Sequence, residues 1–234
     1  MVAEEGFANF TEYLNHIFAD SSGRKIVAFV NKVTTNHTYY WREPRHFEYL
    51  MQYVMPWIEQ NVRDKDARIW CAASSSGEEP YNLCMCIDQY FGMKAAEWDL
   101  RILATDIDTE VLDKARRAEY SYESVKGLPP EYIKKYFKQT SSQTYQVIDR
   151  IKKQVIFREF NLMDKIQYKK PYHLISCRNV MIYFEQDTKN ALVERFYDVT
   201  AQGGFLFIGH AESVSKSSRY SYVEPAIYRK IPKI

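Results

Sequence analysis

The segment at residues 68–81, with the sequence RIWCAASSSGEEPY, most constrains the fold of this chain. Its apolar residues 69–72 predict a strand buried on both faces, because the strands of parallel sheets form continuous apolar runs. Small residues follow at 73–77, where the backbone can approach a ligand closely and Gly77 can adopt a positive φ. Pro80 suits the first turn of a helix. Strand, tight turn and helix together predict a nucleotide-binding corner.

A second apolar run, residues 100–105, predicts a neighbouring strand that ends at Asp106. In folds of this kind an acidic residue at the end of the second strand holds the hydroxyl groups of a ribose. Asp106 is also a good N-cap for the helix that follows, a role for which Asp108 and Thr109 are equally suited. Both interpretations stand for Asp106 alone, and the adjacent corner at Gly77 favours the binding site.

Glu78 and Glu79 begin the helix after the tight turn. Acidic side chains at this place either complement the positive end of the helix dipole or face a ligand. The turn lacks the G-x-G-x-x-G pattern that holds a diphosphate, which argues against a dinucleotide and hence against a dehydrogenase. The corner is better suited to a nucleoside without phosphates.

Composition narrows the functional classes further. The chain has 234 residues, of which 46% are apolar, enough for one large domain with a buried core. Its formal net charge of +2 indicates no strong attraction to nucleic acid. The four cysteines lack the paired spacing of a zinc site, and no segment resembles a secretion signal or a membrane span. We expect a soluble cytoplasmic protein that needs no metal.

Hydrophobic periodicity divides the rest of the chain into helices and strands. Helices are predicted over residues 7–18, 25–32, 44–58 with a kink near Pro56, 81–91, 109–120, 129–137 and 188–200. Further strands are predicted over residues 143–149, 152–160, 172–177, 205–208 and, on either side of Pro225, 220–228. Residues 34–43 have no period and are expected to form a functional loop. This order predicts an α/β protein with an open, mostly parallel sheet, helices on both faces and a ligand at the carboxyl ends of the strands.

Four motifs carry a resemblance to a known family. They are TTNHT with WRE at residues 34–43, SGEEPY at 76–81, ATDID at 104–108 and CRNVMIYF at 177–184. In this order they resemble the CheR family of chemotaxis receptor methyltransferases, which are S-adenosylmethionine-dependent protein-glutamate O-methyltransferases. The resemblance covers roughly residues 30–230 and includes Asn161-Leu162 and GHAES at 209–213.

The resemblance implies a class I methyltransferase fold, with a Rossmann-like sheet and a small antiparallel β-subdomain. It divides the chain into a shortened N-terminal helical segment at residues 1–33 and a methyltransferase domain at 34–234, with the β-subdomain at about 138–160. It also implies S-adenosylmethionine as cofactor, S-adenosylhomocysteine as product, and a cofactor site formed by Asn36, Thr38, Arg42, Ala73, Glu78, Asp106, Asn161, Leu162, Arg178 and Asn179.

Arg42 and Tyr183 are implied to lie nearest the transferred methyl group and are the predicted catalytic residues. A glutamate substrate is ionised at neutral pH, with an ordinary pKa of about 4.3, so the reaction requires neither a general base nor a metal. Two plainer interpretations remain open. Tyr183 suits a buried position beside Phe184, and Arg42 suits a surface ion pair with Glu43 or Glu48. His37 and His210 are interpreted as polar loop residues.

The implied partners are the cytoplasmic helices of methyl-accepting chemotaxis receptors, modified during sensory adaptation by a monomeric enzyme that neither binds nucleic acid nor enters the membrane. Family members that grip a receptor-tail peptide carry a glycine-containing insertion in the β-subdomain. Here the corresponding residues 138–144, KQTSSQT, contain no glycine, so we hypothesise methylation without tail docking. Two alternatives are a catalytically silent S-adenosylmethionine-binding signalling module and a methyltransferase for another protein carboxylate.

Overall fold

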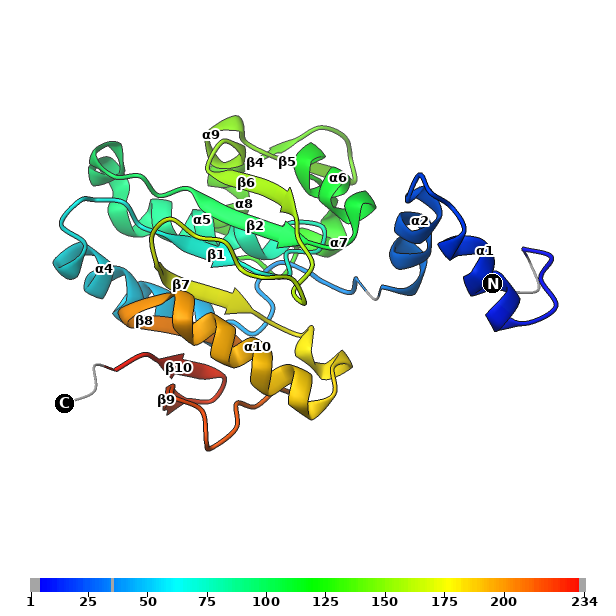
Figure 1. Cartoon of the computed structure of the whole chain (residues 1–234). Coiled ribbons are helices and arrows are strands. Elements are labelled where there is room, and N and C mark those ends of the chain that lie inside the picture. The colour runs from blue at the N-terminus through cyan, green and yellow to red at the C-terminus, as the bar shows by residue number, and fades with distance from the viewer. Residues whose placement is uncertain (1–4, 35, 232–234) are drawn as a thin grey trace.

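A large, mostly parallel sheet forms the centre of the protein (Figure 1). The computed structural model describes residues 5–34 and 36–231, so Thr35 of the TTNHT motif lies outside the described residues. The strand order is β6 (Val155–Glu159), β2 (Ile102–Asp106), β1 (Ile69–Cys71), β7 (Tyr172–Cys177), β8 (Thr200–Ile208), β10 (Ile227–Arg229) and β9 (Ser221–Glu224). Within this sheet β10 alone runs against the others, because it pairs antiparallel with both β8 and β9. The predicted fold class is confirmed.

Alternate residues of the central strands face two separate hydrophobic clusters. In β1, Ile69 and Cys71 join one cluster, whereas Trp70 and the following Ala72 join the other. Helices α3 (Arg45–Tyr49), α4 (Met55–Asn61), α5 (Glu78–Phe91) and α6 (Thr109–Arg117) contribute to the first cluster, and α10 (Gln186–Val199) contributes to the second. The continuous apolar run at 69–72 therefore results from burial on both faces.

The chain crosses from one half of the sheet to the other between β6 and β7, since β1 lies between β2 and β7 in the sheet. Strands β1 and β7 pair in parallel, with Trp70 opposite Ile175. The crossovers leave the sheet in opposite directions at this pair of strands, and such a switch point leaves a crevice at the carboxyl ends of the strands.

The small antiparallel sheet differs from the one expected. Its strand order is β3 (Glu119–Ser121), β5 (Thr144–Val147) and β4 (Phe137–Gln139). The strand predicted over 152–160 is present as β6, but its assignment to the β-subdomain was wrong, because β6 pairs in parallel with β2 at the edge of the large sheet. Alternation misled the prediction because an edge strand that buries Val155 and Phe157 on one face has the same period as a hairpin strand.

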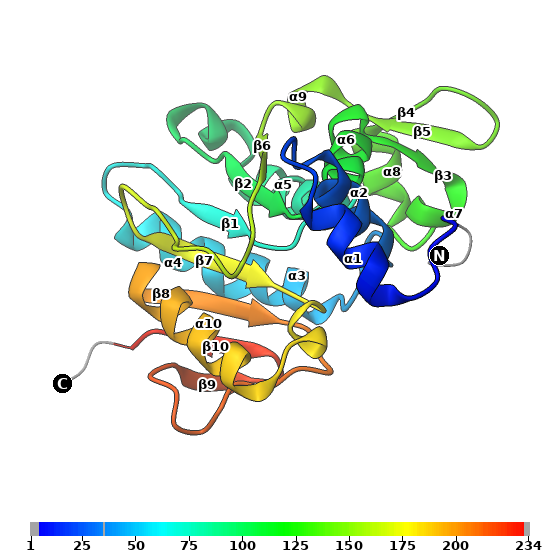
Figure 2. The ribbon, with the colours of Figure 1, turned by 45° about the vertical axis from the view of Figure 1, so that its right-hand side comes forward.

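Two short helices precede the sheet, α1 (Phe10–Phe18) and α2 (Arg24–Val33), and stand beside the main body (Figures 1 and 2). Asn31 of α2 exchanges side-chain and backbone hydrogen bonds with Thr109 at the start of α6, each at 3.3 Å. Among the described residues no helix is both long and apolar enough to cross a membrane.

The predicted helix at 44–58 is interrupted by a π-helical turn, η1 (Leu50–Val54), between α3 and α4. Pro56 has no N–H to donate back along the helix, so the turn before it widens and the expected irregularity appears there. The remaining helical elements are η2 (Gly92–Glu97), α7 (Tyr122–Val125), α8 (Pro130–Tyr136), α9 (Asp149–Lys152) and η3 (Met181–Tyr183).

Candidate active site

A cavity of about 330 Å³ lies at the carboxyl ends of β1, β2, β6 and β7. The loop between α2 and α3 closes one side of it, and η3 contributes to another. Most of the residues that the sequence predicted for the site line this single cavity, namely Asn36, Thr38, Arg42, Ala73, Asp106, Asn161, Leu162, Arg178, Asn179 and Tyr183. Segments far apart in sequence thus meet at one edge of the sheet.

Glu78 is the predicted site residue that does not line this cavity, and Glu79 takes its place. The Glu78 side chain turns into the protein, where Ser76 Oγ donates to it at 2.8 Å and burial raises its pKa. Successive helix residues point about 100° apart, so only one of two neighbours can face the cavity. Glu79 faces it, with Oε2 lying 3.1 Å from Arg178 Nη1.

Asp106 lies at the end of β2 and joins the turn after β1 to the turn after β2. Its Oδ2 accepts from Ser75 N at 2.8 Å, and its Oδ1 accepts from Asp108 N at 3.1 Å. The helix cap is Asp108, whose Oδ1 accepts from Glu110 N and Val111 N. Burial raises the pKa of Asp106. The cap interpretation of Asp106 is therefore wrong, and each of its oxygens keeps a lone pair for a ligand.

The turn after β1 also leaves a polar atom without a partner. Ser74 Oγ is buried, lines the cavity wall and has no hydrogen-bond partner within the described part of the chain. Buried hydroxyl groups nearly always have a partner, so this atom indicates a ligand or water in the cavity. The next residue, Ser75, has a φ of 46° and directs its N–H toward Asp106.

Arg178 is the central cation of the site. Its guanidinium is 2% exposed and lies between two carboxylates, 3.1 Å from Glu43 Oε2 and 3.1 Å from Glu79 Oε2. It also donates a hydrogen bond to the backbone oxygen of Arg42. Burial raises the pKa of Glu43, but the charge of Arg178 and the hydrogen bonds from Asn179 and the His210 backbone outweigh it and hold that pKa at about 2.

Arg42 is held between two residues with left-handed backbone conformations, Trp41 with a φ of 62° and Glu43 with a φ of 58°. Such angles are costly outside glycine and persist where the surrounding structure imposes them. Arg42 Nη1 donates to the backbone oxygen of His37 at 2.7 Å. Glu43 pairs with Arg178 and Glu48 with Arg45, so the surface ion-pair interpretation of Arg42 is wrong.

Tyr183 belongs to η3 and is 59% exposed. The interpretation of Tyr183 as a buried tyrosine is therefore also wrong. Its side chain lines the same cavity as Arg42. An exposed phenol on the wall of a cavity that an arginine also lines is suited to contact a substrate that arrives from solvent.

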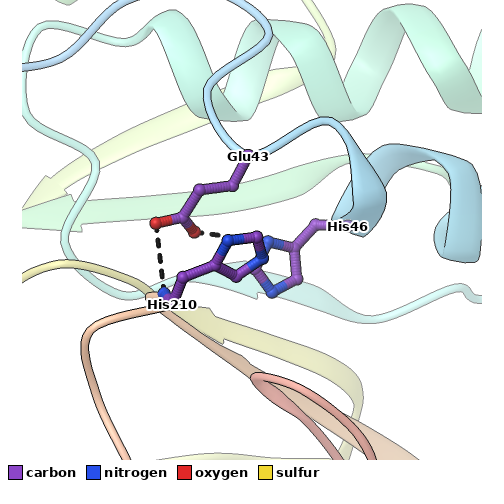
Figure 3. Close-up of side chains that lie close together, drawn as sticks. All are labelled: Glu43, His46 and His210. Carbon is purple, nitrogen blue, oxygen red and sulfur yellow. Dashed lines mark hydrogen bonds and ion pairs between the residues drawn. The ribbon is translucent and has the colours of Figure 1, made fainter.

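Glu43, His46 and His210 lie together, with potential ligand atoms within 4.8 Å of one another (Figure 3). Both Glu43 oxygens already accept hydrogen bonds, one from Asn179 and the His210 backbone and the other from Arg178. Burial lowers the pKa of His46 to about 3, so its ring is neutral and carries no charge to Glu43. A metal would have to share a carboxylate oxygen either with the Arg178 guanidinium or with the N–H groups of Asn179 and His210, so we interpret the cluster as a support for Arg178. The expectation of a metal-free site remains a prediction.

Several contacts that hold the cavity walls were not predicted from the sequence. Asp108 Oδ2 accepts from Thr34 Oγ1 at 2.8 Å and from Asn36 Nδ2 at 2.7 Å, which attaches the loop after α2 to the start of α6. Arg195 of α10 donates to the backbone oxygens of Leu162, Met163 and Asp164 and so fixes the loop after β6. Asp108 lies in the ATDID motif, so a role at the site could have been predicted from the sequence. Nothing in the sequence connects Arg195 to residues 162–164.

Comparisons with known proteins identify the family to which the chain is similar. Residues 36–228 match the sequence model of a family described as "CheR methyltransferase, SAM binding domain". The chain is 38% identical to a chemotaxis protein methyltransferase of Borreliella burgdorferi, covering 97% of this chain and 81% of that protein. It is 36% identical to a chemotaxis protein methyltransferase of Escherichia coli, covering 92% and 73%. A solved amino pentose methyltransferase from Micromonospora echinaspora matches with a TM-score of 0.38 and 11% identity, covering 78% and 54%.

Proposed function

Since the chain belongs to the CheR methyltransferase family, we propose that it transfers the methyl group of S-adenosylmethionine to glutamate carboxylates of chemotaxis receptors. The products are glutamate methyl esters and S-adenosylhomocysteine. The observation that carries this proposal is the single cavity that brings Arg42 and Tyr183 together with Asp106. The names of the relatives supply the receptor class, and the choice of glutamate rests on the chemistry below.

The donor set of the cavity fits S-adenosylmethionine. Asp106 offers carboxylate oxygens to the hydroxyl groups of a ribose, and the unpartnered Ser74 Oγ offers one more polar contact. Glu79 and Arg178 present opposite charges at the cavity wall, which suits the ammonium and carboxylate groups of the methionine part. Asn161 and Asn179, which follow β6 and β7, add amide groups to the cavity lining.

The reaction requires no general acid or base from the protein. The bound cofactor supplies an electrophilic methyl group. A glutamate carboxylate is a sufficient nucleophile when ionised, so the residues around it must orient it and remove water. We assign the orientation to the Arg42 guanidinium and the Tyr183 hydroxyl, because both residues line the cavity and Tyr183 is exposed to solvent. We further propose that the enzyme acts as a monomer and without docking on a receptor-tail peptide.

Transfer of a labelled methyl group to a cytoplasmic receptor fragment tests the proposal. The fragment should acquire label that alkali releases as methanol, because carboxyl esters hydrolyse where amides and amines do not. A matched fragment with glutamine at the methylated positions should stay unlabelled. Cofactor binding without label on any receptor fragment would favour the silent signalling module. Label on other proteins only would favour a different carboxylate substrate.

A further inference from the structure

We propose that Glu212 is a positioning residue for methyl transfer, which holds the turn after β7 so that Tyr183 stays at the cavity. This inference rests on the proposed function for its catalytic part. Glu212 comes from the loop after β8 and does not line the cavity. Its role is therefore carried through the backbone of residues 179–183.

The Glu212 carboxylate accepts three backbone N–H groups from two different segments. Oε2 accepts from Asn179 N at 3.0 Å and from Gly209 N at 2.5 Å, and Oε1 accepts from Ile182 N at 3.2 Å. Ile182 directly precedes Tyr183, and Asn179 begins the turn. One side chain thus fixes both ends of the segment that carries the phenol.

This segment has a conformation that needs support. Asn179 has a φ of 58°, a left-handed angle that asparagine tolerates but does not prefer. Its side-chain amide donates to Glu43 Oε1 at 3.0 Å while its backbone N–H donates to Glu212. Two carboxylates therefore impose the angle, one through the side chain and the other through the main chain.

The end of β8 packs tightly against the same turn. A side chain at Gly209 would collide with the Asn179 amide and backbone nitrogen. Glu212 N donates back to Gly209 O at 2.9 Å, which closes the loop and aims its carboxylate at the turn after β7. The GHAES segment therefore has a geometric reason for both its glycine and its glutamate.

The side chain of Tyr183 is held mainly through its backbone. It is 59% exposed, so packing restrains its side chain weakly. Its place at the cavity depends on the backbone of η3, which hydrogen bonds within the turn, the buried Met181 and the Glu212 carboxylate hold together. A glutamine at position 212 has one oxygen and one NH2 group, and it cannot accept all three N–H groups because its NH2 group would face a backbone donor. We expect the turn to loosen without loss of the fold.

The test compares Glu212→Gln with Glu194→Gln, a half-buried glutamate of α10 outside the cavity that pairs with Arg219. Turnover of Glu212→Gln should fall at least about 10-fold, with S-adenosylhomocysteine affinity changed much less, whereas Glu194→Gln should match the unmodified chain. Tyr183→Phe should then slow the unmodified chain strongly but slow Glu212→Gln by less than about threefold, because the phenol is already displaced. If Glu212 only stabilised the fold, the rate losses of Glu212→Gln and Tyr183→Phe would multiply in the double variant.

Hydrogen exchange at the amides of residues 179–183 separates this inference from the proposed function. Exchange there should accelerate in Glu212→Gln and not in Glu194→Gln. If the unmodified chain methylates no receptor, the proposed function fails, and faster exchange at 179–183 still supports the positioning of the turn. Unchanged exchange together with unchanged turnover, or multiplying effects with Tyr183→Phe, would overturn the role of Glu212.

Discussion

Arg178 and Glu79 face each other at the carboxyl end of β7, with Nη1 and Oε2 3.1 Å apart. Their pairing gives the two glutamates at the start of α5 different roles. Glu79 faces the cavity beside a buried cation, whereas Glu78 is buried among Ser76 and Ser124. This difference leads to the first of five predictions.

We expect Glu79→Gln to weaken binding of S-adenosylhomocysteine by about 10-fold, equivalent to about 1.4 kcal/mol, and Glu78→Gln to leave it within about twofold. Loss of the Glu79 charge removes a charged partner from Arg178 and from the ligand, whereas Glu78 does not reach the cavity. Isothermal titration of both variants checks this. Equal losses of affinity in the two variants would show that Glu78 also contributes to the binding site.

Asp106→Ala should reduce product affinity by roughly 10- to 150-fold, or about 1.5–3 kcal/mol, because it removes charge-assisted hydrogen bonds to the ribose. Asp113→Ala is the matched control, since Asp113 is exposed and pairs with Arg116 on α6. Titration with S-adenosylhomocysteine measures both. An unaffected Asp106→Ala variant would remove this carboxylate from the proposed site.

Tyr183→Phe should bind cofactor nearly normally and transfer methyl at least about 10-fold more slowly, because the phenolic hydroxyl is assigned to the reacting carboxylate. Tyr168→Phe, an exposed tyrosine outside the cavity lining, should keep full turnover. Single-turnover methylation at saturating cofactor measures the step directly. Equal turnover in all three proteins would contradict the assignment.

Glu43→Gln should lower the free energy of unfolding by about 2–3 kcal/mol at pH 7, because it leaves Arg178 buried with one carboxylate fewer. The pKa of Glu43 is lowered to about 2 in the folded protein, so its stabilisation is complete above its ordinary pKa of about 4.5 and disappears as pH falls toward 2. Urea unfolding at pH 7 and pH 3 should therefore give a smaller difference between variant and parent at the lower pH. A difference that grows on acidification would contradict this ion pair.

Removal of the last five residues of a receptor fragment should leave its methylation rate unchanged at equal concentration and ionic strength. Residues 140–143 join β4 to β5, and none of the left-handed non-glycine residues in the described chain lies in this loop. Because residues 138–144 also contain no glycine, the loop lacks the backbone freedom expected of a peptide-gripping insertion. A large rate loss on truncation would show that tethering contributes, and it would contradict the hypothesis of methylation without tail docking.

The sheet was predictable because its strands are short apolar runs with clear ends. Residues 172–177 were predicted as a strand and form β7 with the same bounds, since no charged residue interrupts the run. The strand at 152–160 was assigned to the wrong sheet, because the period of a strand reports how many of its faces are buried and not which strand it pairs with.

Most residues of the site were predictable from the sequence, but the direction in which each side chain points was not. Motifs place Glu78 and Glu79 side by side, and the choice between them depends on how α5 rotates against β1 and β7, which no local pattern encodes. Arg195 and Glu212 act over long separations in sequence through backbone groups of other segments. Their partners carry no side-chain signature, so these contacts are visible only in the folded chain.

The cavity wall is shared among the ends of β1, β2, β6 and β7 and the loop that follows α2. A small molecule in this space can bind only when those four strands have already paired, so its binding energy is added to the unfolding free energy of the whole sheet. At a ligand concentration of 100 times Kd this coupling amounts to about 2.7 kcal/mol. The methyl donor would then stabilise the folded domain, and cells with a high concentration of the donor would hold more of this protein in the folded state.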